Sequence, residues 1–360
     1  MFTKQKSTIV KAVAILMMMW HHCFLAGRFE MYDINFFPFN ASQIANIANF
    51  FKICVSLFAF VSGYGLMKSY SQKQISTNYW IRYRILRTLS GYWFIVVISW
   101  IVSMIIDQRP YYTYNFPKSI FCGICNLILD FMGLSNLFGT DLLNGTWWYM
   151  SAAAIFIILL PLIDLSIKYF GNFCTIGLVF ILPRVAGGYP GGTTFLSFLP
   201  AFCLGMIFSQ KDLFTKWKIF WQLDGKTTFC NSLFKFLVML SLLYCSYKIY
   251  YYLPTDKFWD VKWGLIPIVI ILFVNDYISN VPVLRDLLLF IGKHSTNIFL
   301  VHTFIRHYYL AEFTYSIGHF AIIILVLLVI SILISLIIEY LKKIIGYEMW
   351  IDKLIKWVMQ

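Results

Sequence analysis

Residues 318–340 read GHFAIIILVLLVISILISLIIEY, and their only acidic residue, Glu339, stands near the end. About 20 consecutive apolar residues are enough for an α-helix to cross the ~30 Å hydrocarbon core of a bilayer. The rest of the chain is similar, because 60% of its 360 residues are hydrophobic and only 12% are charged. Soluble domains carry about a quarter charged residues, so a soluble enzyme is excluded. The apolar runs are continuous rather than alternating, which excludes a transmembrane β-barrel.

The sequence predicts an all-α polytopic membrane protein with about ten transmembrane helices in one bundle. The ten apolar stretches are 9–27, 45–67, 88–106, 146–167, 169–184, 193–209, 234–253, 263–280, 294–312 and 318–340. Another apolar stretch, 119–136, carries Asp130 and two glycines, so we expect a re-entrant or interfacial segment there. With no internal repeat in view, we expect one membrane domain over 1–345 and a short cytoplasmic tail over 346–360.

The basic residues gather in alternate loops, and this accounts for a net charge of +13 without a nucleic-acid partner. The loop over 28–44 holds only Arg28. The basic clusters are Lys4, Lys6 and Lys11; Lys68, Lys73, Arg82, Arg84 and Arg87; Lys211, Lys216, Lys218 and Lys226; and Lys342, Lys343, Lys353 and Lys356. Because cytoplasmic loops are rich in Lys and Arg, we expect both termini on the cytoplasmic side of the cell (cytoplasmic or inner) membrane.

Two of the predicted helices carry polar stripes, which are costly inside a membrane. On the first, Lys11 and His22 are eleven residues apart and fall within about 20° of one helix face, whereas His21 lies about 80° from Lys11. On the ninth, Ser295, His302 and Arg306 follow at i, i+7 and i+11. A surface lysine, a packing histidine and an interfacial His–Arg pair would explain each residue alone. Together the two stripes favour a shared interior cavity.

Arg84 and Arg87 form an Arg-x-x-Arg pair beside aromatic residues at the start of the third predicted helix. Guanidinium groups at i and i+3 share a helix face and suit bidentate phosphate binding. Anchoring at the cytoplasmic surface is the alternative explanation. Cys122 and Cys125 form a lone CxxC without a second pair, and we interpret them as buried apolar residues rather than metal ligands.

Five motifs in order resemble the acyltransferase 3 family of bacterial membrane O-acyltransferases, over nearly the whole chain. They are the Lys11-to-His22 spacing; FAFVSGY at 58–64; the Arg84–Arg87 pair; TWWYMSAAAIFIILLPLI at 146–163 followed by LPAFCLGMIF at 199–208; and IGKHSTNIFLVH at 291–302. The resemblance implies transfer of an acyl group, usually acetyl from acetyl-CoA, to a hydroxyl of an envelope glycan. It also implies that His22 and Lys11 are catalytic and that Arg84 and Arg87 hold the CoA phosphates.

Three positions depart from the family pattern. Lys11 stands where arginine is common, which keeps the charge but loses the bidentate fork. Ser90 stands where a proline commonly follows the arginine pair. Met150 precedes Ser151 and three alanines where many members have a glutamate, so that glutamate's role cannot be assumed here.

The residues also suit the chemistry without the family name. A thioester is already activated, so the enzyme needs a base for the acceptor hydroxyl and a site for CoA. Histidine titrates closest to working pH, which makes His22 the candidate base or, alternatively, a transient acyl carrier. The candidate substrate pocket comprises Ser62, Trp148, Tyr149, Ser295, His302 and Arg306.

The partners and the alternatives follow from this interpretation. We expect acyl-CoA as a co-substrate, a glycan or lipid-linked saccharide acceptor and the bilayer as partners, with no metal and no permanently bound cofactor. O-succinyl or other short-acyl transfer is an alternative within the same class. A transporter or flippase for lipid-linked saccharides is the alternative from another class, although such proteins often show internal repeats.

Overall fold

The computed structural model describes residues 2–185, 188, 190–222 and 228–359. Over these residues the chain is helical, with an isolated β-bridge between Asn35 and His319. Lys226 lies outside the described residues. The helices are α1 (Lys4–Phe24), α2 (Ala41–Phe50), η1 (Phe51–Ile53), α3 (Cys54–Ser71), α4 (Thr77–Ile106), α5 (Arg109–Thr113), α6 (Ile120–Phe131), α7 (Ser135–Phe138), η2 (Gly145–Trp147), α8 (Trp148–Val185), α9 (Phe195–Gln210), α10 (Leu213–Phe220), α11 (Phe229–Tyr252), α12 (Thr255–Asp260), η3 (Val261–Leu265), α13 (Ile266–Asp276), η4 (Ile278–Asn280), α14 (Pro282–Lys293), α15 (Ser295–Thr303), η5 (Phe304–Tyr309), α16 (Ala311–Ser316), α17 (Phe320–Ile344) and α18 (Tyr347–Met359).

The prediction of an all-α polytopic membrane protein is confirmed. Within the described residues, seven helical segments are long and apolar enough to cross a membrane: Lys4–Phe24, Ala41–Ser71, Thr77–Ile106, Gly145–Val185, Phe229–Tyr252, Thr255–Asn280 and Phe320–Ile344. Within α8, Gly171 has a left-handed backbone (φ 79°), so this helix consists of two pieces that match the predicted stretches 146–167 and 169–184. The stretches 193–209 and 294–312 form α9 and the shorter pair α15–η5. The total of ten crossings stays a prediction.

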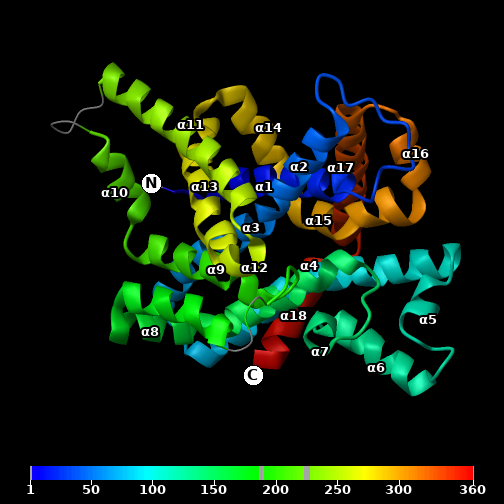
Figure 1. The fold of residues 1–360 in the computed structure, drawn as a ribbon. Coiled ribbons are helices and arrows are strands. Elements are labelled where there is room, and N and C mark those ends of the chain that lie inside the picture. Colours follow the sequence, from blue (N-terminus) through cyan, green and yellow to red (C-terminus); the bar gives the residue numbers. More distant parts are fainter. Residues whose placement is uncertain (1, 186–187, 189, 223–227, 360) are drawn as a thin grey trace.

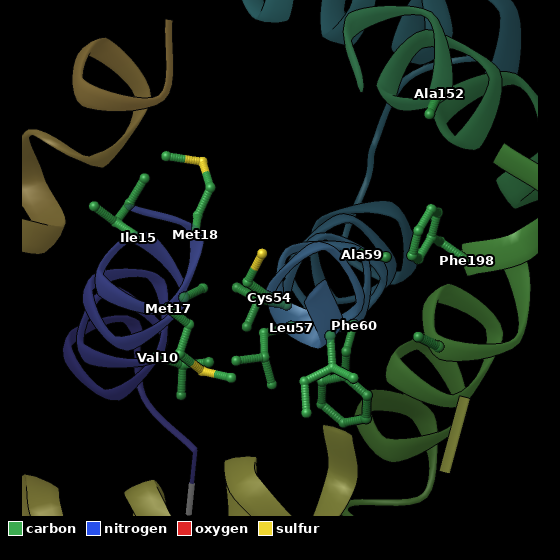
Figure 2. Packing of buried hydrophobic residues seen from close by; sticks show 14 of the residues in the cluster. Val10, Ile15, Met17, Met18, Cys54, Leu57, Ala59, Phe60, Ala152 and Phe198 are labelled. Atoms are coloured by element: carbon green, nitrogen blue, oxygen red, sulfur yellow. The ribbon is translucent and has the colours of Figure 1, made fainter. Parts of the chain in front are cut away.

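Helices α3 and α9 cross at backbone contact because each has a glycine at the crossing. A Cβ atom on Gly63 would lie 2.1 Å from the carbonyl oxygen of Phe202, and one on Gly205 would lie 2.1 Å from that of Phe60. Small residues allow this approach in membrane bundles, where dispersion contacts drive helix association. On its other side α3 faces α1, and apolar side chains such as Val10, Met17 and Leu57 fill the interface (Figure 2). This packing fixes α1 inside the bundle (Figure 1).

Helix α6 is too short to span the bilayer, since 12 residues rise about 18 Å. A buried carboxylate ties it to its neighbours. Asp130 is fully buried and accepts hydrogen bonds from the hydroxyls of Tyr92 (2.9 Å) and Tyr114 (2.8 Å) and from the backbone N–H of Leu143 (3.0 Å). Tyr92 belongs to α4, so one side chain joins α6, α4 and two loops.

Replacing Asp130 by Ala should therefore destabilise the protein by about 3 kcal/mol, because it leaves the buried hydroxyl of Tyr114 and the amide of Leu143 without an acceptor, whereas Tyr92 keeps the backbone carbonyl of residue 130. Thermal unfolding of the purified protein in detergent measures this. Asp130→Asn, which keeps one acceptor oxygen, should unfold at a temperature between those of the wild type and the Ala variant. An unchanged unfolding temperature for the Ala variant would show that water replaces the carboxylate.

The segment expected as a cytoplasmic tail is the helix α18, and it docks on α4. The hydroxyl of Tyr347 donates a 2.6 Å hydrogen bond to the carbonyl of Ser90, and the Tyr347 ring packs edge-on against Phe94. In this sequence Ser90 keeps the α4 backbone helical where a family proline is common, and its hydroxyl donates to the carbonyl of Arg87 at 3.0 Å. The C-terminal helix is thus part of the folded bundle.

Candidate active site

His22 lies in the last turn of α1, and Arg28 folds back onto it from the following loop. One guanidinium nitrogen (Nη1) of Arg28 lies 3.1 Å from Nδ1 of His22 and 3.1 Å from the carbonyl oxygen of His22. A guanidinium can only donate, so Nδ1 is the accepting nitrogen and the proton of the neutral ring sits on Nε2. Arg28 therefore occupies the lone pair of Nδ1.

His302 is fully buried on α15, with its ring centroid 5.1 Å from that of His22. Its Nδ1 lies 3.1 Å and 2.9 Å from the carbonyl oxygens of Ile298 and Phe299, which can only accept. Nδ1 thus carries the proton, and Nε2 faces the hydroxyl of Thr303 at 3.2 Å. The two histidines of the separate predicted stripes therefore lie side by side in the structure.

Arg306 completes the cluster from η5, a π-helix that begins just after His302. It is only 7% exposed, and its charge acts on both His22 and His302. The carbonyl of Leu300 accepts from the Nδ2 amide of Asn144 (3.1 Å) and the indole N–H of Trp147 (3.0 Å). These two side chains hold the backbone at the point where the helix widens, and π-helical turns of this kind are frequent at functional sites.

The other candidate pocket residues lie at varying distances from this cluster. Tyr149 packs against the helix that carries His302, because its ring contacts that of Phe299 (6.0 Å between centroids), and its hydroxyl is buried without a hydrogen-bond partner among the described residues. Trp148 packs against Phe198 instead. Ser295 is buried at the start of α15, seven residues or about 10 Å before His302. Among these residues, Tyr149 and Ser295 therefore belong to or contact α15, the helix of His302.

Lys11 does not contact His22 directly. The eleven residues that separate them rise about 16 Å along α1, so the shared face leaves the two groups three turns apart. The charge of Lys4 is near enough to act on Lys11, which places Lys11 toward the N-terminal end of the helix. Any role for Lys11 is thus with another part of the substrate.

Arg84 lies beside a separate cavity of about 390 Å³ at the α3–α4 turn. Its guanidinium donates to the hydroxyl of Ser69 and stacks over the ring of Trp80, with 5.6 Å to the centroid. Lys73 and Tyr83 also line the cavity. Two cations and two aromatic rings around an open space suit a ligand that carries both phosphates and a planar base.

Arg87 turns away from that cavity toward α18. It pairs with Glu348 at 3.3 Å and with Asp352, both on the C-terminal helix. Burial is slight here, so these ion pairs are weak and exchangeable. The structure therefore gives the two arginines different polar partners, although both guanidiniums lie over the ring of Tyr83, at 6.0 Å and 5.8 Å from its centroid.

Sequence reasoning missed Arg28, Asn144 and Trp147. Arg28 was counted only as a loop residue, and no helical spacing links it to His22. The interpretation of Cys122 and Cys125 as buried residues is wrong for Cys122, which is exposed on α6, while Cys125 is partly buried. Across the described residues no three His, Cys, Asp or Glu side chains gather as metal ligands.

Comparison with known proteins gives one match. The model of the acyltransferase 3 family, described as an acyltransferase domain, matches residues 7–340. No curated protein and no solved structure matches the chain. The matched range includes every candidate site residue above, from Lys11 to Arg306.

Proposed function

Because this chain belongs to the acyltransferase 3 family and is a membrane-embedded acyltransferase, we propose that it moves a short acyl group, most readily acetyl, from cytoplasmic acyl-CoA to an envelope hydroxyl. The acceptor is a surface or exported polysaccharide or its lipid-linked precursor. O-succinyl transfer is the variant of this proposal that differs only in the acyl group. The family match removes the grounds for a transporter.

The observation that carries the proposal is the pairing of His22 and His302 at one end of the bundle, with the cationic Arg84 cavity at the opposite end of α1 and α3. The phosphate-bearing part of CoA would bind at Arg84, on the side where both termini are expected. Its thioester end would reach His22 past Lys11. This division matches a donor and an acceptor that arrive from different sides.

The chemistry needs one base. His22 takes the proton from the acceptor hydroxyl, whose oxygen bonds to the thioester carbonyl carbon. The carbon–sulfur bond then breaks, and the CoA thiolate leaves and recovers the proton. In the alternative route a ring nitrogen of His22 attacks the thioester carbon and the CoA thiolate leaves; the acceptor hydroxyl then takes the acyl group from the ring, and its proton goes to the thiolate. Positioned bases contribute typically 10²–10⁴-fold to such steps.

A strain that lacks this chain tests the proposal. Proton NMR of its surface and exported glycans should lose one O-acyl signal, and the wild-type chain should restore it. The chemical shift of the lost signal distinguishes acetyl from succinyl. Glycans with unchanged acylation would refute a glycan acceptor.

Arg84 and Arg87 should serve the donor. Arg84→Ala should raise the KM for acyl-CoA about tenfold or more, because a charge-assisted phosphate contact is lost. Arg84→Lys should recover only part, since lysine cannot form the bidentate contact. Arg87→Ala should have the smaller effect, because Arg87 must first leave Glu348 and Asp352. Initial rates at varied acyl-CoA and fixed acceptor measure this, and a change in acceptor KM alone would contradict it.

A further inference from the structure

Arg28 is a half-buried cation whose neighbours are not carboxylates. Its guanidinium is held by the ring and the carbonyl of His22. The nearest acidic residue in the sequence, Glu30, accepts instead from the backbone N–H of Gly27 at 2.8 Å. Burial and the charge of Arg306 lower the pKa of Arg28 from its ordinary value, so its surroundings oppose its charge.

Arg306 is also a cation without an ion-pair partner among the described residues, and it is more deeply buried than Arg28. It is 7% exposed, and its Nε is buried without a hydrogen-bond partner among the described residues. Its charge acts on Arg28 as well as on both histidines. A buried guanidinium with an unused N–H is a donor directed at something the protein does not supply.

In the described part of the chain, neither arginine takes part in an ion pair. The pairs present involve Arg87, Arg109, Lys168, Arg184, Lys235, Arg285 and Lys342. Two cations therefore share one buried site with neutral imidazoles and the hydroxyl of Tyr315, which interacts with Arg306, and the described residues supply no counter-ion. Burial of uncompensated charge is expensive, and charges retained inside a membrane protein usually face a substrate.

We propose that Arg28 and Arg306 form an anion-binding subsite beside His22, and that a carboxylate or phosphate of the substrate fills it and draws Arg28 off Nδ1 of His22. This inference rests on the proposed acyl transfer. In the resting arrangement Arg28 covers the lone pair that a base needs. The bound anion uncovers it, so His22 becomes competent only when the correct substrate is in place. Arg28 is thus a positioning residue that acts through His22.

The anion has two possible carriers with the same chemistry. It is either a carboxylate at the end of the acyl group, as in a succinyl donor, or an acidic group on the acceptor glycan. An acetyl donor with a neutral sugar would leave the subsite empty. The subsite therefore selects against that combination.

The test observes His22 itself. The purified protein in detergent, with ¹⁵N-labelled histidine, is titrated with inorganic phosphate and with succinate at constant ionic strength set by sodium chloride. The signal absent from His22→Gln identifies its ring. We expect a saturable shift of the Nδ1 resonance as Arg28 leaves, and no such shift in Arg28→Gln. A shift that persists in Arg28→Gln, or no saturable shift with either probe, overturns the inference.

Paired ligands identify the carrier. A shift with succinyl-CoA but not acetyl-CoA assigns the charge to the acyl group. A shift with methyl glucuronide but not methyl glucoside assigns it to the acceptor. Either result supports the subsite. In transfer assays Arg28→Gln should lower kcat/KM roughly 10- to 100-fold, and Arg28→Lys should recover part of the loss. These shifts are measured without turnover, so their absence would overturn the anion subsite alone. The acyl-transfer proposal is tested separately, by the glycans of the deletion strain.

Discussion

Replacing His22 by Ala should abolish acyl transfer, with a loss of at least about 100-fold, while the protein still accumulates in the membrane. The expected loss is the contribution of a positioned base. His22 packs at the end of α1 next to His302, and its removal leaves Arg28 without one hydrogen-bond partner but breaks no buried ion pair. Acyl groups on the glycan, normalised to the amount of folded protein, are the measurement.

Two neighbouring histidines are the matched controls for this prediction. The Nδ1 atom of His21 lies 2.7 Å from the carbonyl oxygen of Ala48, and this hydrogen bond joins α1 to α2. His21→Ala should therefore cost about 1 kcal/mol of stability but keep activity. His302→Gln should keep part of the activity, because we assign His302 a supporting role beside the acyl or acceptor path. Equal loss in His21→Ala and His22→Ala at equal protein levels would contradict the assignment of the base.

Replacing Gly63 by Ala should destabilise the bundle by about 3 kcal/mol or more, the upper end of overpacking costs. The new Cβ would lie 2.1 Å from the carbonyl oxygen of Phe202, which belongs to the α9 backbone and cannot rotate away. Helices α3 and α9 must therefore separate, which also displaces Ser62. The expected result is a low yield of monodisperse protein in detergent and a lower unfolding temperature.

Gly65 provides the control on the same helix. A Cβ there has nothing within 4 Å, and Ala is a better helix former than Gly by about 1 kcal/mol. Gly65→Ala should therefore be neutral or stabilising. If both variants unfold alike, the close crossing of α3 and α9 does not limit stability.

The sequence was sufficient for the class of fold, and the site residues stay predictions. Continuous apolar runs predict helices well because a bilayer enforces internal hydrogen bonding. The polar stripes predicted that His22 and His302 would matter, and the structure brings their rings together. Periodicity describes one helix at a time: it placed His22 and His302 on polar faces, but a shared face did not bring Lys11 to His22.

The failures concern contacts between distant segments. Arg87 meets Asp352 across 265 residues, and no local pattern distinguishes it from Arg84. Arg28 reaches His22 from a loop, where side-chain direction follows no repeat. The same holds for Asp130, whose polar character suggested an interfacial segment but did not reveal Tyr92 and Tyr114 as its donors. These contacts depend on how the helices pack, which the spacing of residues does not encode.

The π-helix η5 has a consequence for evolution. A helix that accommodates one additional residue within a turn widens locally, as between Phe304 and Tyr309, instead of breaking. Deleting a single residue there would restore the regular helix but rotate Arg306 out of line with His302. A homologue without that additional residue would align with a gap of a single position yet present a different side chain to the two histidines. Substrate preference in such lineages could therefore change through one inserted or deleted codon, with every catalytic residue retained.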